Sequence, residues 1–530
     1  MSSTNRDVVV IGAGHNGLVA ACYLARAGLD VEVVERDSVV GGAVSTVERF
    51  PGVRMDRGSS AHIMIRQTGI IEELDLARHG LVYQDLDPWG FAPVNTPDGD
   101  QQAIIFWVDL EATCASIAEV CSQQDADAYR RFVRDWLPRN KVVFDFFART
   151  PTPLNLGRTM TAMRRATPAG VSRMTRDMLG SADAVLDYYF TDERLKSALS
   201  WMAAQSGPPS HEPATADMVG WLTMLHNMAP GHPIGGSGKL SESLANALGA
   251  AGGTLTLGDG AERILTHNDK VTGVRLLSGR TISTTTIVAA SHIHTTARLL
   301  ADDYEHLATD ISKRARTGNG LGMVVRAHTR AVPQYPSDQD QISDRAMVLL
   351  ADSRRELRAN YGQYLAGERP RNPAALVMAP SKQDSTLAPA GEHTVTIWGQ
   401  WHAHELADGS SWSEHRETEA EKLVSVVDKW APGFADSVIN LWTQTPADLE
   451  SELGLINGNV MHLEMSLDQM FSLRPLPEHA QYRIAGISGL YLAGASTHPG
   501  GGVFGASGRS VAGVVRRDRR SIRGIRSCLR

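Results

Sequence analysis

Residues 7–35 read DVVVIGAGHNGLVAACYLARAGLDVEVVE, and this stretch decides the fold. Val8 to Ile11 form an uninterrupted apolar run, which is typical of a parallel strand that is buried on both faces. A G-x-G-x-x-G pattern follows, then a helical pattern of apolar residues, and then a second apolar run, Val31 to Val34. This is the order of a dinucleotide-binding βαβ unit.

The three glycines and the acid that ends the second run each have a physical role. Gly12 permits a tight turn, Gly14 lets the backbone approach a pyrophosphate, and Gly17 lets the helix and strand pack closely. The first turn of the helix has free N–H groups and partial positive charge, which favour a phosphate. Glu35 can accept hydrogen bonds from both ribose hydroxyls and would repel a 2′-phosphate. The unit therefore predicts a dinucleotide cofactor.

A double glycine, Gly41 and Gly42, follows in the segment ERDSVVGGAVST. It would let a second loop pass close to the cofactor phosphates, which favours FAD over NAD, with an ordinary turn as the alternative. Near the other end of the chain, residues 489–513 read GLYLAGASTHPGGGVFGASGRSVAG. They predict a short buried strand, a glycine-rich loop and a helix that begins after Pro499. We expect the N-terminus of that helix to face the flavin.

The sequence resembles the phytoene-desaturase-like flavoproteins, a branch of the glutathione-reductase and amine-oxidase superfamily, and among them most closely the desaturase-type β-carotene ketolases. The resemblance covers the whole chain. It is carried by the N-terminal glycine pattern and by MDRGSSAH (55–62), PIGGSGKLSESLANAL (233–248), GNVMHLEMSLDQM (458–470) and LYLAGASTHPGGG (490–502). It implies an α/β fold with a discontinuous FAD-binding Rossmann domain of the glutathione-reductase/amine-oxidase type and an α+β substrate-binding domain. The FAD-binding domain would comprise 1–88, 231–300 and 486–530, and the substrate-binding domain 89–230 and 301–485.

The resemblance also assigns residues to an FAD site. It implies that the cofactor contacts Gly12, Gly14, Gly17, Glu35, Gly41, Gly42, Gly494 and Gly502, that Ala261 and Glu262 hold the adenine through their backbone, and that His498 lies in the flavin loop. Two positions depart from the family pattern. Ala43 stands where relatives often carry an arginine for the pyrophosphate, and Ala495 and Ser496 stand where many carry an aspartate for the ribityl chain. FAD is still expected, with those hydrogen bonds made by other groups.

The chemistry should come from the flavin, because the sequence has no Ser-His-Asp order, no H-E-x-x-H motif and no spacing that indicates a metal site. The segments of the resemblance supply polar candidates, and we single out His62, His462 and Asp468 as catalytic residues, with Glu464 as a further carboxylate. A carboxylate could stabilise the positive charge that hydride abstraction leaves on a substrate. For each residue the alternative is a hydrogen bond that orders a loop.

The resemblance implies hydride abstraction from a hydrophobic conjugated substrate, as in carotenoid desaturation or ketone formation. Segment 89–230 is rich in Met, Trp, Phe and Leu residues. These residues could form the wall of a long apolar pocket, or they could belong to an ordinary hydrophobic core. One alternative is an FAD dehydrogenase or oxidase of an amine, an amino-acid-derived compound or a heterocycle, and another is a flavin-binding module without turnover. No second nicotinamide-binding unit is recognisable, so we expect oxygen, a quinone or a redox protein as electron acceptor.

The composition bears on partners and location. The chain has 530 residues and a net charge of −7, which predicts no nucleic-acid partner. Its 4 cysteines form no C-x-x-C pair and indicate reduced thiols in the cytoplasm. No stretch approaches the roughly 20 apolar residues of a membrane span.

The C-terminal segment 511–530 reads VAGVVRRDRRSIRGIRSCLR. A helix there would gather apolar residues on one face and arginines elsewhere, which predicts peripheral contact with the anionic inner face of a membrane, against the alternative of a solvated tail. The apolar residues of this face are Val511, Val515, Ile522, Ile525 and Leu529.

Overall fold

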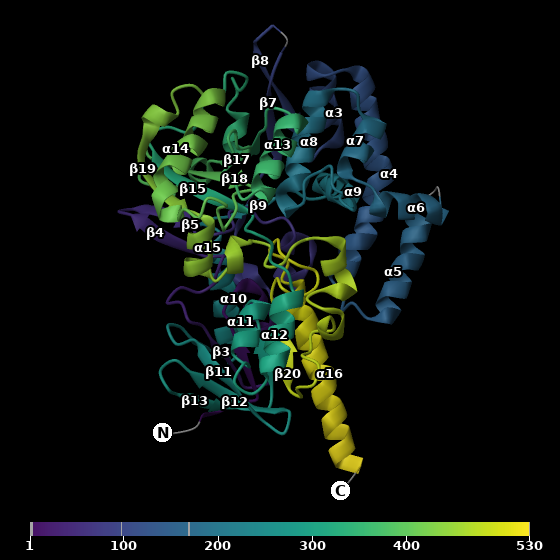
Figure 1. The fold of residues 1–530 in the computed structure, drawn as a ribbon, viewed down its shortest axis with the longest axis vertical. Coiled ribbons are helices and arrows are strands. Elements are labelled where there is room, and N and C mark those ends of the chain that lie inside the picture. Colours follow the sequence, from purple (N-terminus) through teal and green to yellow (C-terminus); the bar gives the residue numbers. More distant parts are fainter. Residues whose placement is uncertain (1–3, 97, 168–169, 529–530) are drawn as a thin grey trace.

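The structure is a computed structural model that describes residues 4–96, 98–167 and 170–528. A parallel five-stranded sheet occupies the lower half of the molecule in Figure 1 and has the order β10-β3-β2-β14-β20. Its strands are β2 (Val8–Ile11), β3 (Val31–Val34), β10 (Thr254–Thr256), β14 (Ile287–Ala289) and β20 (Leu490–Leu492). The apolar run at the start of the sequence therefore forms the central strand, as predicted.

Alternate residues of β2 face two separate cores. Val8 and Val10 pack with α1 (His15–Arg26), α10 (Gly238–Ala250) and α16 (Ala506–Cys528). Val9 and Ile11 pack on the opposite face, with α11 (Ile293–Arg298), α12 (Glu305–Arg314) and a four-stranded sheet of order β1-β13-β12-β11. The strands of that sheet are β1 (Thr4–Asn5), β11 (Ala261–His267), β12 (Lys270–Leu276) and β13 (Thr281–Ser283). Because layers cover both faces, the continuous apolar strand is the pattern that this position requires.

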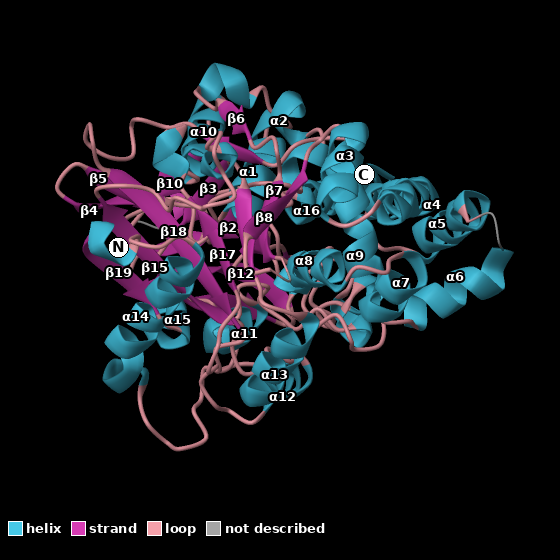
Figure 2. Cartoon of the chain, turned by 90° about the horizontal axis from the view of Figure 1, so that it is seen from above, coloured by secondary structure: helices cyan, strands magenta, loops and turns pink. Residues whose placement is uncertain are grey.

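A mixed seven-stranded sheet of order β19-β15-β18-β17-β16-β7-β8 forms the upper half of the molecule. Its strands are β7 (Gly90–Asn95), β8 (Gln101–Phe106), β15 (Gly322–Thr329), β16 (Met347–Leu350), β17 (Ala375–Met378), β18 (His393–Gln400) and β19 (Val438–Gln444). Figure 2 shows the strands of the molecule gathered on one side and the helices α3 to α9 on the other. These helices are α3 (Leu110–Val120), α4 (Gln123–Phe147), α5 (Pro153–Ala166), α6 (Gly170–Leu179), α7 (Ala182–Tyr189), α8 (Glu193–Ala203) and α9 (Ala216–Gly220).

Smaller elements complete the described chain. The remaining strands form two antiparallel two-stranded ladders, the hairpin of β4 (Thr46–Phe50) with β5 (Val53–Asp56) and the long-range pair β6 (Tyr83–Asp85) with β9 (Gly231–Pro233). The remaining α-helices are α2 (Ile70–Glu73), α13 (Arg354–Leu365), α14 (Trp412–Trp430) and α15 (Pro446–Leu453). Short 3₁₀ helices span Ile65–Gln67, Leu76–His79, Ala204–Ser206, Trp221–His226, Ile342–Arg345, Pro380–Lys382, Ala435–Ser437, Ile456–Gly458, Leu467–Gln469, Phe471–Leu473 and Pro477–His479.

The two large sheets draw their strands from different parts of the sequence. All strands of the five-stranded sheet come from 1–88, 231–300 and 486–530, and all strands of the seven-stranded sheet come from 89–230 and 301–485. One helix crosses this division, because Ala308 and Ile311 of α12 pack into the core beneath the five-stranded sheet. The domain boundaries themselves remain a prediction.

The C-terminal helix begins later than the sequence suggested. α16 starts at Ala506 rather than directly after Pro499, because three glycines of the intervening loop adopt positive φ angles, at Gly500 (121°), Gly502 (111°) and Gly505 (69°). A loop, and not a helix, therefore follows Pro499.

The predicted apolar face of the C-terminal helix is partly covered by the protein itself. Val511 and Val515 are fully buried in the core that contains α1. Arg519 of the same helix pairs with Asp7 at 2.6 Å. The side chains of Ile522 and Ile525, and Leu529 as a whole, lie outside the described residues. Within the described chain, every helix is too short or too polar to cross a lipid bilayer.

Candidate active site

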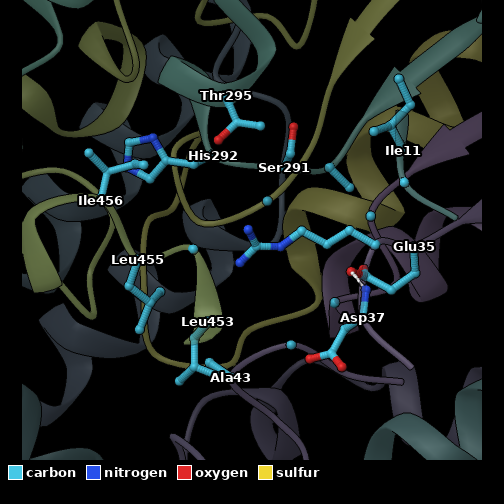
Figure 3. A pocket seen from close by; sticks show the side chains of 18 of the residues that line it. Ile11, Glu35, Asp37, Ala43, Ser291, His292, Thr295, Leu453, Leu455 and Ile456 are labelled. Atoms are coloured by element: carbon cyan, nitrogen blue, oxygen red, sulfur yellow. Dashed lines mark hydrogen bonds between the residues drawn. The ribbon is translucent and has the colours of Figure 1, made fainter. Parts of the chain in front are cut away.

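A cavity of about 380 Å³ lies at the carboxyl ends of β2, β3 and β14, beside the N-terminus of α1. We call it the cofactor cavity. Its walls come from segments 11–16, 34–37, 41–43, 260–261, 290–299, 450–456 and 494–495, together with Leu277 and His462. In Figure 3, Glu35 and Asp37 lie on one side of this cavity, and His292, Leu455 and Ile456 lie on the opposite side. This is the edge of a doubly wound sheet at which dinucleotides bind.

The three glycines of the first loop differ in what surrounds them. Gly12 has a φ angle of 102°, which only glycine adopts readily. A Cβ added at Gly14 would meet no protein atom within 4 Å, so this position faces open space in the cavity wall. A Cβ at Gly17 would lie 2.2 Å from the carbonyl oxygen of Gly12, so Gly17 is required for packing. These roles agree with those expected from the motif.

The double glycine approaches the first loop directly. The N–H of Gly41 donates to the carbonyl of Ala13 at 3.0 Å, and Gly41 and Gly14 form an isolated parallel bridge. A Cβ on Gly41 would lie 2.1 Å from the carbonyl oxygen of Val44, so any side chain would push this loop away. Two glycine-containing loops therefore enclose the phosphate end of the cavity.

Glu35 ends β3 and holds the adjacent turns together. One carboxylate oxygen accepts the N–H of Ala13 at 2.7 Å, and the other accepts the N–H of Asp37 at 3.0 Å; the second of these bonds is drawn in Figure 3. A carboxylate oxygen has two lone pairs, so each can still accept a bond from a ribose hydroxyl.

A pair of histidines lines the far side of the cavity. The His292 ring stacks on that of His462 with centroids 4.9 Å apart. His292 Nδ1 accepts the N–H of His294 at 3.2 Å, so its proton is on Nε2, which donates to the carbonyl of His462 at 3.1 Å. Burial lowers the pKa of His292 to about 3 and the pKa of His462 well below its usual range. Both rings are therefore neutral at physiological pH.

Ser496 joins this pair to the C-terminal loop. Its Oγ accepts the N–H of Ile293 at 3.1 Å and lies 3.1 Å from His462 Nδ1. His462 has a φ angle of 66°, in the left-handed region that strains a residue with a side chain. Strain of this kind is often retained at functional sites.

A second cavity, of about 620 Å³, lies on the other side of the chain around His462. We call it the second cavity. Its walls come from segments 206–215, 317–321, 361–364, 459–468 and Leu473. Asn459, Met461 and Glu464 line this cavity, whereas His462 lines the cofactor cavity. Residues 459–465 therefore separate the two cavities, and we call them the dividing segment.

A buried arginine fixes the dividing segment in place. Arg474 is fully buried and donates to the carbonyls of Met461 (2.7 Å), Glu464 (3.2 Å) and Ala495 (2.8 Å), among others. Burial lowers its pKa to about 9, so the guanidinium is still charged at neutral pH. Since Ala495 lines the cofactor cavity, Arg474 ties both cavities to one rigid support.

The structure brings together many, but not all, of the predicted site residues. The following line the cofactor cavity: Gly12, Gly14, Glu35, Gly41, Gly42, Ala261, His462 and Gly494. Gly17 lies beneath the first loop. Glu262 and Gly502 are not among the lining residues, and the Glu262 carboxylate instead accepts a bond from Arg275 Nε at 2.5 Å. The assignment of adenine contact to Glu262 gains no support from this placement.

The candidate catalytic residues do not converge on one point. His62 is fully buried and lines neither cavity, with its ring nitrogens 2.7 Å from Tyr83 Oη and 2.9 Å from Ser237 Oγ. His498 is also buried, 3.2 Å from the carbonyl of Phe146. Asp468 lines the second cavity, but its carboxylate pairs with Arg316 at 2.9 Å. Of the three candidate catalytic residues, His62, His462 and Asp468, only His462 lines the cofactor cavity, and His498, which was expected in the flavin loop, lines neither cavity.

Several wall residues were not foreseen from the sequence. Ser291 and His292 lie just beyond the end of β14, after Ala290, and the carboxyl end of a parallel strand is a signal that could have identified them. Glu212, Tyr361 and Tyr364 of the second cavity carry no such signal, because they lie in segments far apart in the sequence. Of the two alternatives for the apolar residues of 89–230, Phe146, Phe147 and Trp201 follow the second, since they are buried core residues that line neither cavity.

The residues of the cofactor cavity fit FAD. A Cβ at Gly14, which caps the N-terminus of α1, would meet no protein atom within 4 Å, so the loop leaves open space beside the free N–H groups of the first helical turn. The glycine loops leave room for a pyrophosphate, and Glu35 stands where an adenosine ribose would lie. The N–H groups of the first turn of α1 are donors that could act in place of the arginine that Ala43 replaces.

Comparison with known proteins agrees with this geometry. The sequence model of an NAD(P)-binding Rossmann-like domain matches residues 10–74. The chain is 30% identical to the pyridine nucleotide-disulfide oxidoreductase domain-containing protein 2 of Rattus norvegicus, over 97% of this chain and 93% of that protein. It is 26% identical to the neurosporene-forming phytoene desaturase of Rhodobacter capsulatus, over 96% of this chain and 93% of that one.

A solved structure shares the fold. Putrescine oxidase superposes with a TM-score of 0.60 over 97% of this chain and 100% of that chain, at 15% identity. The α/β fold with an FAD-binding Rossmann domain is therefore confirmed, and the finer resemblance to the β-carotene ketolases stays a prediction. The chain belongs to the family of pyridine nucleotide-disulfide oxidoreductase domain-containing protein 2 and is an FAD-dependent oxidoreductase.

Proposed function

We propose that this protein oxidises a small organic molecule, bound in the second cavity, by transfer of a hydride to FAD. One observation carries this proposal: a single stretch of chain, the dividing segment, presents His462 to the cofactor cavity and Asn459, Met461 and Glu464 to the second cavity. A substrate in the second cavity would thus lie one layer of residues away from the cofactor. Hydride transfer needs the reacting atoms to lie about 3–3.5 Å apart, so the proposal requires the substrate's reacting carbon and the flavin ring to meet at an edge of the dividing segment rather than across it.

When bound, FAD supplies an acceptor for one hydride, which carries two electrons, from a C–H bond. The substrate loses that hydride and one proton, and oxygen, a quinone or a redox protein then takes up two electrons and two protons. The protein contributes orientation and exclusion of water. Arg474 contributes to both, because it holds the dividing segment rigid through bonds to backbone carbonyls.

His462 is the candidate with the best placement, and we propose that it positions the cofactor rather than moving a proton. Its pKa lies far below its usual range, so it stays neutral and is a poor acid at physiological pH. If Ser496 Oγ–H donates to Nδ1, the other ring nitrogen carries the proton and offers a donor to the cofactor cavity. His62 is better explained as a structural residue, since both of its ring nitrogens have hydrogen-bond partners.

The experiment is anaerobic mixing of the FAD-loaded protein with candidate substrates, followed by the visible absorbance of the flavin. An oxidisable substrate bleaches the flavin at a rate that rises to a plateau with concentration. If no compound bleaches it while dithionite does, the chain is a flavin-binding module without turnover. Re-admission of oxygen, or addition of a soluble quinone, then identifies the acceptor.

A second candidate is carotenoid desaturation or ketone formation. It is supported by the phytoene desaturase of Rhodobacter capsulatus, which is 26% identical over 96% of this chain. Expression in a host that makes β-carotene, followed by analysis of the pigments, tests it. A new pigment that depends on FAD binding would favour this candidate, and an unchanged pigment profile with full flavin content would count against it.

A further inference from the structure

The second cavity combines aromatic faces with carboxylates. Tyr361 and Tyr364 of α13 both line it, and their rings stack with centroids 5.6 Å apart and planes 28° apart. Tyr364 is oriented by donating its hydroxyl to the carbonyl of Gly320 at 3.0 Å. Tyr361 is held at its edge by Trp401, with ring centroids 5.6 Å apart. Two tyrosines fixed in this way present π-faces that attract cations.

The charges in this cavity have one sign. Glu212, Glu464 and Asp468 line it, and among the residues that the structure describes no lysine, arginine or histidine does. Arg316, outside the lining, pairs with Glu464 at 3.0 Å and with Asp468 at 2.9 Å. One guanidinium therefore serves two carboxylates and leaves a negative balance.

Glu212 differs from the other two carboxylates. In the described part of the chain no basic side chain lies within ion-pair distance of it, although it is only half exposed. The pKa of Tyr361 is raised to about 12, mainly by burial and also by the negative charges of Glu212 and Glu464. Both carboxylates are therefore close enough to Tyr361 to affect its hydroxyl group electrostatically. The unpaired carboxylate and the tyrosine pair therefore share one region of the cavity.

We propose that the second cavity binds a small organic cation, such as the protonated form of an alkylamine or arylalkylamine, with Glu212 as the charge partner and Tyr361 and Tyr364 as the aromatic surface. This inference rests on the proposed function for its claim that the cation is the substrate. Met461, Met465 and Leu321 supply apolar contact for the rest of such a molecule. A volume of about 620 Å³ lies within the usual range for compact organic ligands.

The proposal distinguishes this substrate class from a carotenoid. A neutral hydrocarbon gains nothing from three carboxylates and would remove them from water at a cost. A cation replaces part of their hydration with a charge-assisted contact and places its chain against the methionines. Polarity and charge, rather than size, are what favour the cation here.

The experiment is calorimetric titration of the FAD-loaded protein with benzyltrimethylammonium, a permanent cation, and with neopentylbenzene, its neutral isostere. We expect the cation to bind at least tenfold more tightly. Glu212→Gln should weaken binding of the cation about tenfold, and Tyr361→Leu about fivefold, whereas Tyr361→Phe should change it less than twofold. Asp468→Asn is the matched control, because that carboxylate is already paired with Arg316, and it should change binding less than threefold.

The outcomes separate this inference from the proposed function. Equal affinity for the two isosteres, or loss of cation binding in Asp468→Asn but not in Glu212→Gln, would overturn the cation site. Flavin bleaching by a neutral substrate together with no cation binding would leave the proposed function standing and this inference refuted. Cation binding with no bleaching by any amine, tested with benzylamine and 1,4-diaminobutane, would leave a cation site but refute oxidation of amines.

Discussion

The two cavities share a wall but are built from different parts of the chain. The cofactor cavity is made largely of backbone: glycines in two loops, the first turn of α1 and the ends of three parallel strands. The second cavity is made of side chains from four segments that are distant in sequence. A site made of backbone needs particular glycines at fixed spacings, whereas a site made of side chains needs only a shape and a charge. The first can therefore be read from a motif and the second cannot.

The largest effect should come from filling the backbone-built site. Gly14→Val is expected to weaken FAD binding by about 3 kcal/mol or more, roughly 100-fold, because the new side chain would project into space that the protein leaves open. The backbone there is extended, with a φ angle of −64°, so valine itself is tolerated. The measurement is the flavin content per chain after gel filtration. Gly249→Val, at an exposed glycine of α10 with equally open surroundings, is the control and should retain full flavin.

Glu35 tests the contribution of a side chain within the backbone-built site. Glu35→Ala removes the acceptor of two backbone N–H groups and of the ribose, so FAD affinity should fall by about 1–3 kcal/mol. Fluorescence titration of the FAD-free protein with FAD measures it. Glu242→Ala, which removes an exposed carboxylate paired with Lys239, should leave the affinity unchanged. An unchanged affinity in Glu35→Ala would mean that the ribose is held by another group.

The next largest effect is the pH dependence of stability that His292, in the wall of the cofactor cavity, should produce. His292 has a folded-state pKa of about 3, below its usual 6.5, because it is buried. Between these values the unfolded chain binds a proton that the folded chain excludes, so stability falls as the pH falls from 6.5 towards 3. His292→Gln should reduce the loss of unfolding free energy between pH 7 and pH 5 by about 1–2 kcal/mol, measured by urea denaturation. His306→Gln, on the exposed surface of α12, should leave that loss as it is.

The smallest effect concerns the C-terminal helix and the route by which a substrate arrives. Because Val511 and Val515 are buried, any contact with an anionic membrane would depend on exposed arginines such as Arg516. Arg516→Ser should therefore weaken co-sedimentation with anionic vesicles by at most about 1 kcal/mol, and high salt should remove the difference. Vesicle binding that survives high salt would instead indicate apolar contact with the membrane. If neither the unmodified protein nor Arg516→Ser binds the vesicles, the substrate does not reach the protein from a membrane through this helix.

The sequence allowed the fold and half of the site to be predicted, for physical reasons. The strand at Val8–Ile11 and the glycine positions follow from local constraints, since a buried strand and a phosphate loop each permit few residues. The helix after Pro499 was misplaced because its beginning depends on the φ angles of the intervening glycines, which sequence does not reveal. The catalytic role of His62 stays a prediction, and the sequence does not reveal that its ring is buried between Tyr83 and Ser237, outside both cavities.

The second cavity could not be predicted from the sequence. Glu212 and Tyr361 meet only because of the tertiary fold, and each is unremarkable among its neighbours in the sequence. Asp468 was predicted as a catalytic carboxylate and lines the second cavity, but its pairing with Arg316 depends on a contact across 152 positions of the chain. Long-range pairing of this kind is visible only in three dimensions.

The dividing segment also has a consequence for how such a protein could diverge. Within this segment His462 lines the cofactor cavity, and Asn459, Met461, Glu464 and Met465 line the second cavity. Arg474 fixes several of its backbone carbonyls. A lineage that acquires a new substrate therefore has little freedom here. It would change the opposite walls, at 206–215 and 361–364, where a substitution alters the ligand without disturbing the flavin. The same division tells a protein engineer where to place a mutagenic library.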